Sequence, residues 1–210
     1  MELRGGLRYT KDKKSFNVQA YTSDVFGTLP TLAALGAAGP LSANPKDNKV
    51  SWDVSATYAL DKNMKLYARV ANGFRASSVQ GASAFNNQSV AKPETSTSFE
   101  AGVKADLFDR KARLSFGVFR YDIKDQQLTA VGGAANANIL LNAKKTQGQG
   151  FEMDLQAYLT PNLLATLGGA YNDTKIKDPS LAVAVCAACT VTDPRTASGL
   201  ARIDGTPLPQ

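Results

Sequence analysis

The residues with the clearest capacity for chemistry are two cysteines late in the chain. Cys186 and Cys189 form a C-x-x-C motif, which elsewhere serves redox chemistry or supplies two ligands to a zinc site. A tetrahedral zinc site needs four ligands, and the sequence offers no other cysteine and no histidine. A redox pair is expected at the start of a helix, which the surrounding alanines do not indicate. The motif therefore predicts neither a metal site nor a redox centre.

Other arrangements that support catalysis or nucleotide binding are incomplete. Without histidine the chain cannot form a Ser-His-Asp or Cys-His nucleophile arrangement. Two glycine pairs, Gly132-Gly133 and Gly148-x-Gly150, lack the Gly-Lys-Ser/Thr sequence and the following helix that a phosphate loop requires. They are interpreted as strand kinks and turns. No cofactor is predicted.

Charge and hydropathy narrow the class of protein further. The chain has 24 Lys and Arg against 18 Asp and Glu, but these charges are spread along it, and only Lys11, Lys13 and Lys14 are crowded. A nucleic-acid-binding protein would gather these charges on one face, so nucleic-acid binding is not predicted. No run approaches the roughly 18 apolar residues of a transmembrane helix, whereas a mean hydropathy of −0.21 is compatible with a membrane β-barrel.

Period-2 alternation predicts β-strands that are joined in pairs by short polar turns. The clearest example runs from Phe99 to Leu107, where apolar and polar residues alternate strictly before a turn at 108–111. The same pattern predicts strands at 3–9, 16–22, 50–60, 64–70, 99–107, 112–124, 151–159 and 163–171, with turns at 11–14, 61–63, 108–111 and 160–162. Long loops are expected at 23–48, 73–92, 126–143 and from 177 onward.

The spacing of the turns indicates the architecture. They recur at steps of about 50 residues with only two strands each, where a propeller blade would hold four. All short turns must then lie at one end of the sheet and all long loops at the other. We predict an all-β fold, an antiparallel up-and-down meander of about eight strands that is part of a transmembrane β-barrel. In the strand after Lys111, alternation changes phase between Val118 and Phe119, which predicts a β-bulge or an exit from the membrane.

Several segments together resemble the barrel of TonB-dependent outer-membrane receptors. The resemblance covers about Trp52 to Pro209, and it is carried by 65–76 (KLYARVANGFRA), 92–104 (KPETSTSFEAGVK), 113–127, 147–152, 159–163 and 203–209. The family's plug domain, its energy-coupling box and an aromatic C-terminal residue have no counterpart. Residues 1–210 are therefore interpreted as a partial TonB-dependent receptor β-barrel domain without plug or terminal strands. A complete eight-stranded barrel is the alternative.

The resemblance implies transport across the bacterial outer membrane and no enzyme activity. The expected cargo is a ferric-siderophore-like ligand, and the expected partners are outer-membrane lipid and the TonB complex, the latter acting through a plug domain. Short turns would face the periplasm and long loops the outside. The alternatives are a receptor for a carbohydrate or cobalamin, a passive porin-like channel, or a soluble all-β binding module.

The resemblance also assigns places to individual residues. Arg75 and Phe74, where a strand leaves for its loop, are the expected ligand contacts, because a cation beside a ring suits an anionic aromatic chelate. Cys186 and Cys189 are expected to form a disulfide that clips an extracellular loop in an oxidising compartment. Its stabilising effect would be modest because the loop is short. Lumen positions are expected for Arg69, Glu100, Lys104, Glu152 and Asp154, and lipid positions for Phe99, Ala101, Val103 and Leu107.

Overall fold

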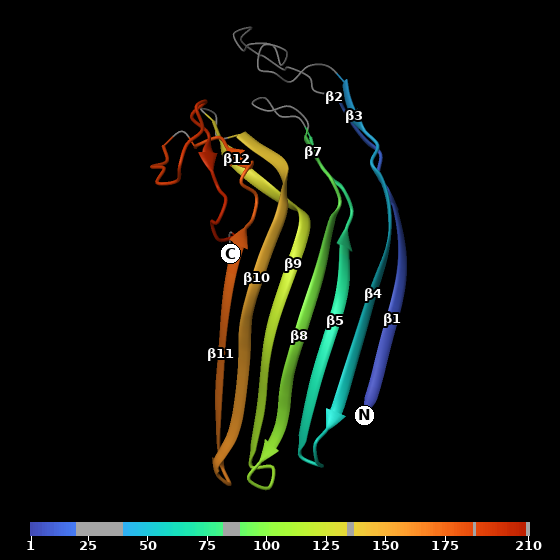
Figure 1. Ribbon diagram of the computed structural model, residues 1–210, viewed down its shortest axis with the longest axis vertical. Helices are drawn as coiled ribbons and strands as arrows, with labels where there is room; N and C mark the ends of the chain where they lie inside the picture. The colour runs from blue at the N-terminus through green and yellow to red at the C-terminus, as the bar shows by residue number, and fades with distance from the viewer. Residues whose placement is uncertain (20–39, 82–88, 134–136, 187, 209–210) are drawn as a thin grey trace.

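The computed structural model describes residues 1–19, 40–81, 89–133, 137–186 and 188–208. One sheet of seven long strands dominates it (Figure 1). These strands are β1 (Glu2–Lys13), β4 (Lys46–Ala59), β5 (Met64–Arg75), β8 (Glu94–Leu107), β9 (Ala112–Gly132), β10 (Ala137–Thr160) and β11 (Leu163–Ile176). Three short pairs accompany it: β2 (Phe16–Gln19) with β3 (Pro40–Ala43), β6 (Ser78–Gln80) with β7 (Ser89–Ala91), and β12 (Ala182–Val183) with β13 (Ala201–Arg202).

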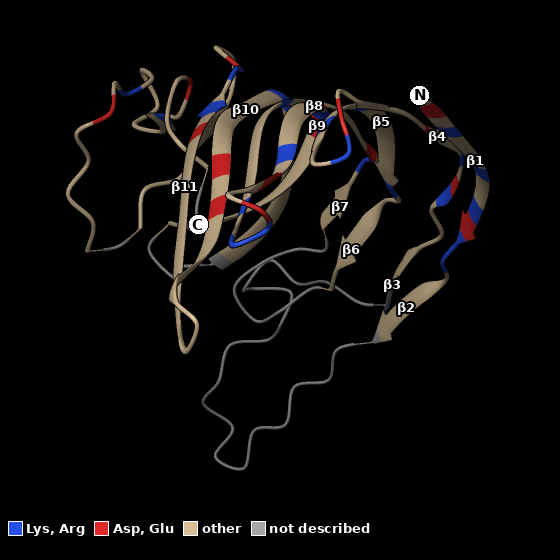
Figure 2. Cartoon of the chain, turned by 90° about the horizontal axis from the view of Figure 1, so that it is seen from below, with Lys and Arg blue, Asp and Glu red and all other residues tan. Residues whose placement is uncertain are grey.

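The long strands pair in chain order and are antiparallel throughout. Within the described residues the sheet runs from β1 to β11 without a crossover and curves into an open arc (Figure 2). The all-β, up-and-down prediction is therefore confirmed. The described part of the chain contains no helix that could cross a membrane.

Three of the four predicted short turns are present. Asp61 organises the first, since its carboxylate accepts the N–H groups of Asn63 and Met64 at 2.6 and 2.9 Å. The second, at 108–111, has three consecutive residues with positive φ and closes with a bond from the Lys111 N–H to the Phe108 carbonyl. The third joins β10 to β11.

The predicted turn at 11–14 is wrong, whereas the strand predicted at 16–22 is present over its described part as β2 (Phe16–Gln19), although it does not pair with β1. β1 continues to Lys13 and pairs with β4 over twelve residues, from Glu2 opposite Thr57 to Lys13 opposite Lys46. Pairing with the full length of β4 gives β1 more backbone hydrogen bonds than pairing with the short stretch at Phe16 would. That stretch pairs with β3 instead. The main sheet consequently has seven strands rather than about eight. Residues 20–22, and most of the loop predicted at 23–48, lie outside the described residues.

The loop predicted at 126–143 is also wrong, because β9 and β10 continue as a hairpin to Gly132 and from Ala137. The phase change at Phe119 is not a bulge, since the ladder with β8 runs unbroken from Leu107 to Thr95. Arg120 is the next residue after Val118 on the same face of β9, so this face changes from apolar to polar there. The hairpin thus leaves the apolar zone, and a segment with water on both sides has no reason to alternate.

Cross-strand partners share a face, so the register divides the whole sheet into two faces. The apolar face carries Phe99, every second residue of β8 counted from it, and their cross-strand partners. The polar face carries Glu100, every second residue counted from it, and their partners. Side chains on the apolar face are widely exposed: Leu7 is 82% exposed, Val54 53% and Phe99 48%. A water-soluble sheet would cover such a surface, whereas a lipid-facing one leaves it bare. Further exposed members are Leu3, Val50, Trp52, Tyr58, Leu66, Phe116, Val118, Phe151, Leu167 and Tyr171.

The upper edge of the apolar face runs obliquely across the strands. On β11 the last apolar residue of this face is Tyr171. Following the residues paired across each strand from Tyr171 leads to Leu3 on β1. On β1, however, the apolar face continues to Tyr9. That offset is about 20 Å along the strand over a sheet width of about 29 Å, which corresponds to a tilt of about 35°. Strands of outer-membrane barrels tilt by this amount.

Aromatic rings cover glycines on the polar face. Tyr67 lies over Gly102 and Gly117, where an added Cβ would come within 2.7 and 2.8 Å of its ring and hydroxyl atoms. Tyr121 occupies the space above Gly148 in the same way. Gly148 therefore makes room for a ring, and Gly150 makes room for the backbone carbonyl of Tyr171 and the ring of Phe119. Gly133, directly after the end of β9, has a φ of +77°, in the region that favours glycine.

Candidate functional site

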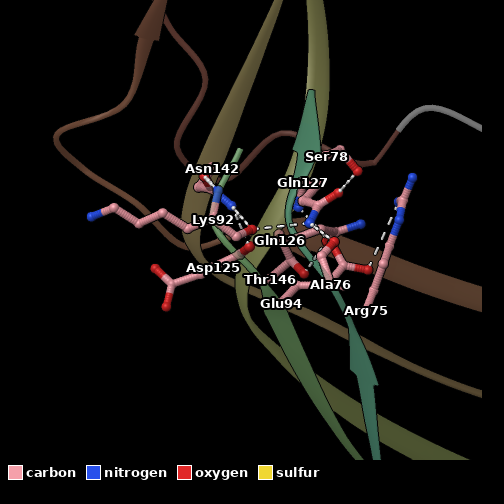
Figure 3. Close-up of polar contacts among 10 residues, drawn as sticks. All are labelled: Arg75, Ala76, Ser78, Lys92, Glu94, Asp125, Gln126, Gln127, Asn142 and Thr146. Atoms are coloured by element: carbon pink, nitrogen blue, oxygen red, sulfur yellow. Dashed lines mark hydrogen bonds and ion pairs between the residues drawn. The ribbon is translucent and has the colours of Figure 1, made fainter. Parts of the chain in front are cut away.

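The described parts of the long connections lie at the end of the sheet opposite the short turns, and a network of polar contacts there joins the connection between β5 and β8 to the β9–β10 hairpin (Figures 1 and 3). We call this network the loop-end cluster. It comprises Arg75, Ala76, Ser78, Lys92, Glu94, Asp125, Gln126, Gln127, Asn142 and Thr146. Its members come from β5, β8, β9, β10 and the connection between β5 and β8, which carries β6 and β7 and which we call the β6–β7 connection. The cluster therefore spans about half of the sheet.

Gln127 is the centre of the cluster and is only 7% exposed. Its side-chain amide donates to the carbonyls of Ala76 and Lys92 at 2.8 and 2.9 Å. Its side-chain oxygen accepts from the Ser78 hydroxyl at 2.5 Å, and its backbone N–H donates to Glu94 at 2.6 Å. Every polar group of the buried side chain is thus paired, as burial requires.

Asn142 holds the same connection from the β10 side. Its amide donates to the carbonyls of Lys92 and Asp125 at 3.0 and 2.7 Å, and its side-chain oxygen accepts the Lys92 N–H at 2.8 Å. Gln126 and Thr146 add a side-chain hydrogen bond between β9 and β10. The β6–β7 connection is therefore fastened to the projecting hairpin at both of its ends.

Arg75 is the one predicted ligand contact that lies in this cluster. Its guanidinium faces Glu94 at 3.9 Å and its side chain is 61% exposed, so it keeps most of its capacity for another anion. Phe74 is its neighbour on the strand and consequently projects from the opposite face. The structure therefore separates the cation from the ring with which it was expected to act.

The connection after β11 is folded back onto the hairpin by a buried carboxylate. Asp178, 2% exposed, accepts hydrogen bonds from the Lys144 N–H at 2.9 Å and from both the N–H and hydroxyl of Ser180. Its own N–H donates to Asp204 at 2.7 Å. Burial alone would raise the pKa of Asp178, but the hydrogen bonds from Lys144 and Ser180 outweigh it and lower the pKa below its ordinary value of 3.8.

The C-x-x-C motif lies on this connection, next to the end of β9. The Gly133 N–H donates to the Val185 carbonyl at 2.9 Å, and Gly132 lies too close to the Ala184 backbone to carry a side chain. The structure records Cys186 and Cys189 as bonded, with Cα atoms 5.2 Å apart, a separation that disulfides allow. The redox state of the thiols in the cell stays a prediction.

The stretch that follows Ile203 turns back along the free edge of β11. The Ile176 N–H donates to the Thr206 carbonyl, the Gly205 N–H donates back to Ile176, and the Leu208 N–H reaches the Thr174 hydroxyl. This is the direction in which a further antiparallel strand would run.

The predicted lumen residues all share the polar face. Glu100, Glu152 and Asp154 border a concavity of about 410 Å³ together with Tyr67. Tyr67 and Glu100 border the same concavity, and the Lys104 ammonium lies 5.6 Å from the centre of the Tyr67 ring. Arg69 pairs with Asp53 at 3.7 Å. These positions place the predicted lumen residues on the polar wall of the sheet, where Arg69 and Arg75 each have one carboxylate neighbour at a similar distance.

Sequence reasoning missed Gln127, Asn142 and Asp178. Apart from Ser180, which is two residues from Asp178, their side-chain partners lie 17 to 51 residues away, so no local pattern marks these residues. Among the described residues, no group of three or more Cys, His, Asp and Glu side chains could hold a metal ion.

Comparison with known proteins agrees with this architecture. The family model described as "TonB dependent receptor-like, beta-barrel" matches residues 2–210. The chain is 28% identical over 119 residues, or 57% of its length, to the "Ferric-pyoverdine M114 receptor PbuA" of Pseudomonas sp. (strain M114), and that match covers 14% of the relative.

Solved structures share the fold. The siderophore receptor PiuA of Acinetobacter baumannii superposes with a TM-score of 0.64 at 17% identity, over 99% of this chain and 26% of that one. The ferric yersiniabactin uptake receptor FyuA of Yersinia pestis gives 0.61 at 21% identity, over 83% and 24%. The chain thus spans about a quarter of the length of these receptors. It belongs to the TonB-dependent receptor family, as a β-barrel segment of the bacterial outer membrane.

Proposed function

We propose that this chain forms part of the wall of a receptor that takes up a ferric siderophore. The observation that carries the proposal is the two-faced sheet that matches the family barrel over residues 2–210, together with a curated relative that is a ferric-pyoverdine receptor. In this role the apolar face meets outer-membrane lipid and the polar face lines the lumen. The short turns lie in the periplasm and the long connections outside.

Ligand capture belongs to the loop end in this proposal. Arg75 faces the interior side of the wall, is held by one ion pair and stays mostly exposed, as a contact for an anionic iron chelate should. The loop-end cluster fixes the connections around it, so a ligand that reaches Arg75 meets a preorganised rim. Phe74, on the other face, is not part of this contact.

We further propose that transport is energised through TonB and a plug domain outside these 210 residues. The length comparison supports this, since the described sheet corresponds to about a quarter of receptors that share its fold. The coding sequence on either side would test it. A plug domain in the same reading frame is expected, and its absence would favour a passive porin-like channel.

The uptake proposal is tested in the bacterium that encodes the chain. Radioactive iron uptake is measured in the gene deletion and in the complemented strain, with pyoverdine, hydroxamate and catecholate chelates offered separately. One chelate should depend on the gene and on the proton-motive force. Parallel uptake of cobalamin and of a maltooligosaccharide should not change. Loss of either of those with intact iron uptake would overturn the siderophore assignment.

The role of Arg75 is tested separately with matched variants. Arg75→Gln should weaken binding of the transported chelate by about tenfold, the worth of one charge-assisted hydrogen bond. Arg110→Gln removes the same charge from a turn at the other end of the sheet and should leave binding unchanged. Equal affinities for the two variants would remove Arg75 from the ligand site while leaving the transport proposal intact.

A further inference from the structure

A hollow of about 490 Å³ lies on the polar face of β1, β4, β5 and β8. Its floor is made of small residues that are paired across the four strands. They are Gly6, Ser51, Ala71, Gly73, Ser96 and Ser98. Because Gly73 is two residues from Arg75 on β5, the hollow begins about 7 Å from the proposed ligand contact.

Two guanidinium groups border this floor at opposite edges. Arg8 on β1 and Arg69 on β5 are two strands apart, which is about 10 Å across the sheet. Arg69 shares its cross-strand row with Arg4, four residues from Arg8, so the two arginines are also offset by about 13 Å along the strands. A span of this size fits a chelate better than a single small anion. We call the floor and the two arginines the arginine–serine hollow.

The arginine–serine hollow carries more positive charge than its carboxylate balances. Asp53 faces Arg69 at 3.7 Å and lies flat over Gly6, where an added Cβ would come within 2.7 Å of its Oδ1 atom. Arg8 is exposed and forms no ion pair with any of the described residues. One guanidinium of the hollow is therefore available in full, and the other is shared with a single carboxylate.

Serine hydroxyls supply neutral donors on the floor between the two arginines. The Ser96 hydroxyl lies over Gly73, where an added Cβ would come within 2.5 Å of its oxygen, so glycine makes room for it. Ser96 and Ser98 are half-buried, and in the part of the chain that the structure describes their hydroxyls bond to no other protein group. The floor can thus donate hydrogen bonds to a ligand.

These groups select for carboxylate oxygens. A guanidinium donates two parallel N–H bonds to a carboxylate, and hydroxyls suit the oxygens that remain. Trp52, the aromatic residue next to the hollow, pairs with Leu7 on the apolar face, so among the described residues no ring is placed there to stack on a catechol. We propose that the arginine–serine hollow binds a ferric chelate that carries carboxylates, held between Arg8 and Arg69. This inference rests on the uptake proposal and narrows its substrate class.

The test uses the receptor that contains this chain, purified in detergent from outer membranes. Isothermal titration calorimetry measures the affinity for ferric citrate and for a tris-hydroxamate ferric chelate without carboxylates. The wild type should bind ferric citrate at least about tenfold more tightly than the hydroxamate, because only citrate can pair with both guanidinium groups. Arg8→Gln and Arg69→Gln should each weaken ferric citrate binding by about tenfold and leave hydroxamate binding unchanged.

A matched control separates the hollow from general charge. Arg4→Gln removes the same charge from the same face of β1, where Arg4 is paired with Glu2 at 2.6 Å outside the hollow, and should leave the affinity unchanged. All variants must keep the heat-modifiable gel mobility of a folded barrel. The proposal is overturned if Arg8→Gln and Arg69→Gln bind ferric citrate like Arg4→Gln, or if the hydroxamate binds as tightly as ferric citrate.

Two further outcomes would also overturn the proposal. Displacement of ferric citrate by millimolar inorganic phosphate would make the hollow a site for any small anion. Unchanged affinity with a lower unfolding temperature in both arginine variants would mean that the hollow packs against another part of the receptor. Gene-dependent iron uptake from chelates without carboxylates alone would remove this inference and leave the uptake proposal intact. Absence of any gene-dependent iron uptake would instead contradict the uptake proposal.

Discussion

Replacing Gln127 by Leu should release the β6–β7 connection from the sheet. The substitution keeps a side chain of similar size but removes the two bonds that the amide donates to Ala76 and Lys92 and the one it accepts from Ser78. At about 1 kcal/mol for each net hydrogen bond, the docked connection loses about 3 kcal/mol. Local opening should therefore become about 100-fold more frequent.

Hydrogen exchange of the protein in detergent measures this opening directly. Amides of β6 and β7 should exchange about 100-fold faster in Gln127→Leu, while those in the lower half of β8 keep their wild-type rates. Gln147→Leu is the matched control, because Gln147 makes its side-chain bond to Asp122 on the other face. Unchanged exchange in β6 and β7 would refute the reasoning that Gln127 fastens the connection.

Three further predictions concern other parts of the molecule. Asp178→Asn should speed proteolysis of the connection after β11. Because the pKa of Asp178 is lowered, its stabilising effect is complete above the ordinary value of 3.8 and is lost as the pH falls through the lowered pKa. Proteolysis of the wild-type protein at acidic pH should therefore speed up in the same way. Gly150→Ala should cost about 2 kcal/mol in urea unfolding, since its Cβ would overlap a backbone carbonyl of β11, whereas Gly169→Ala meets open space and should cost almost nothing. Alkylation followed by intact-mass measurement should label Cys186 and Cys189 only after reduction, and two labels on unreduced protein would contradict the disulfide.

Much of the sheet could be predicted because a membrane wall imposes a strict pattern. From Phe99 to Leu107 every second side chain must be apolar, and that period identifies both the strand and its two faces. The turns at 61–63 and 108–111 could be predicted because polar residues interrupt the period. The alternation at Phe16 follows the same rule, but only the competing partner β4 decides the pairing of β1, and sequence periodicity carries no information on competition between partners.

The loop end could not be predicted for a different physical reason. Beyond Val118 both faces of the β9–β10 hairpin meet water or polar loops, so the period that marks a strand disappears although the ladder continues. The bonds of Gln127 and Asn142 join segments brought together only by the finished fold. Phe74 was paired with Arg75 because the two are adjacent in sequence, but adjacency on a strand places side chains on opposite faces.

The central claim is that the sheet is a membrane wall with lipid on one side and an aqueous interior on the other. Spin labels placed singly from Ser98 to Leu107, in a background without Cys186 and Cys189, test it in membranes. Accessibility to oxygen should peak at the odd positions 99, 101, 103 and 105 and fall at the even positions between them. Accessibility that lacks this two-residue period, or that peaks at Glu100 and Lys104, would contradict the account.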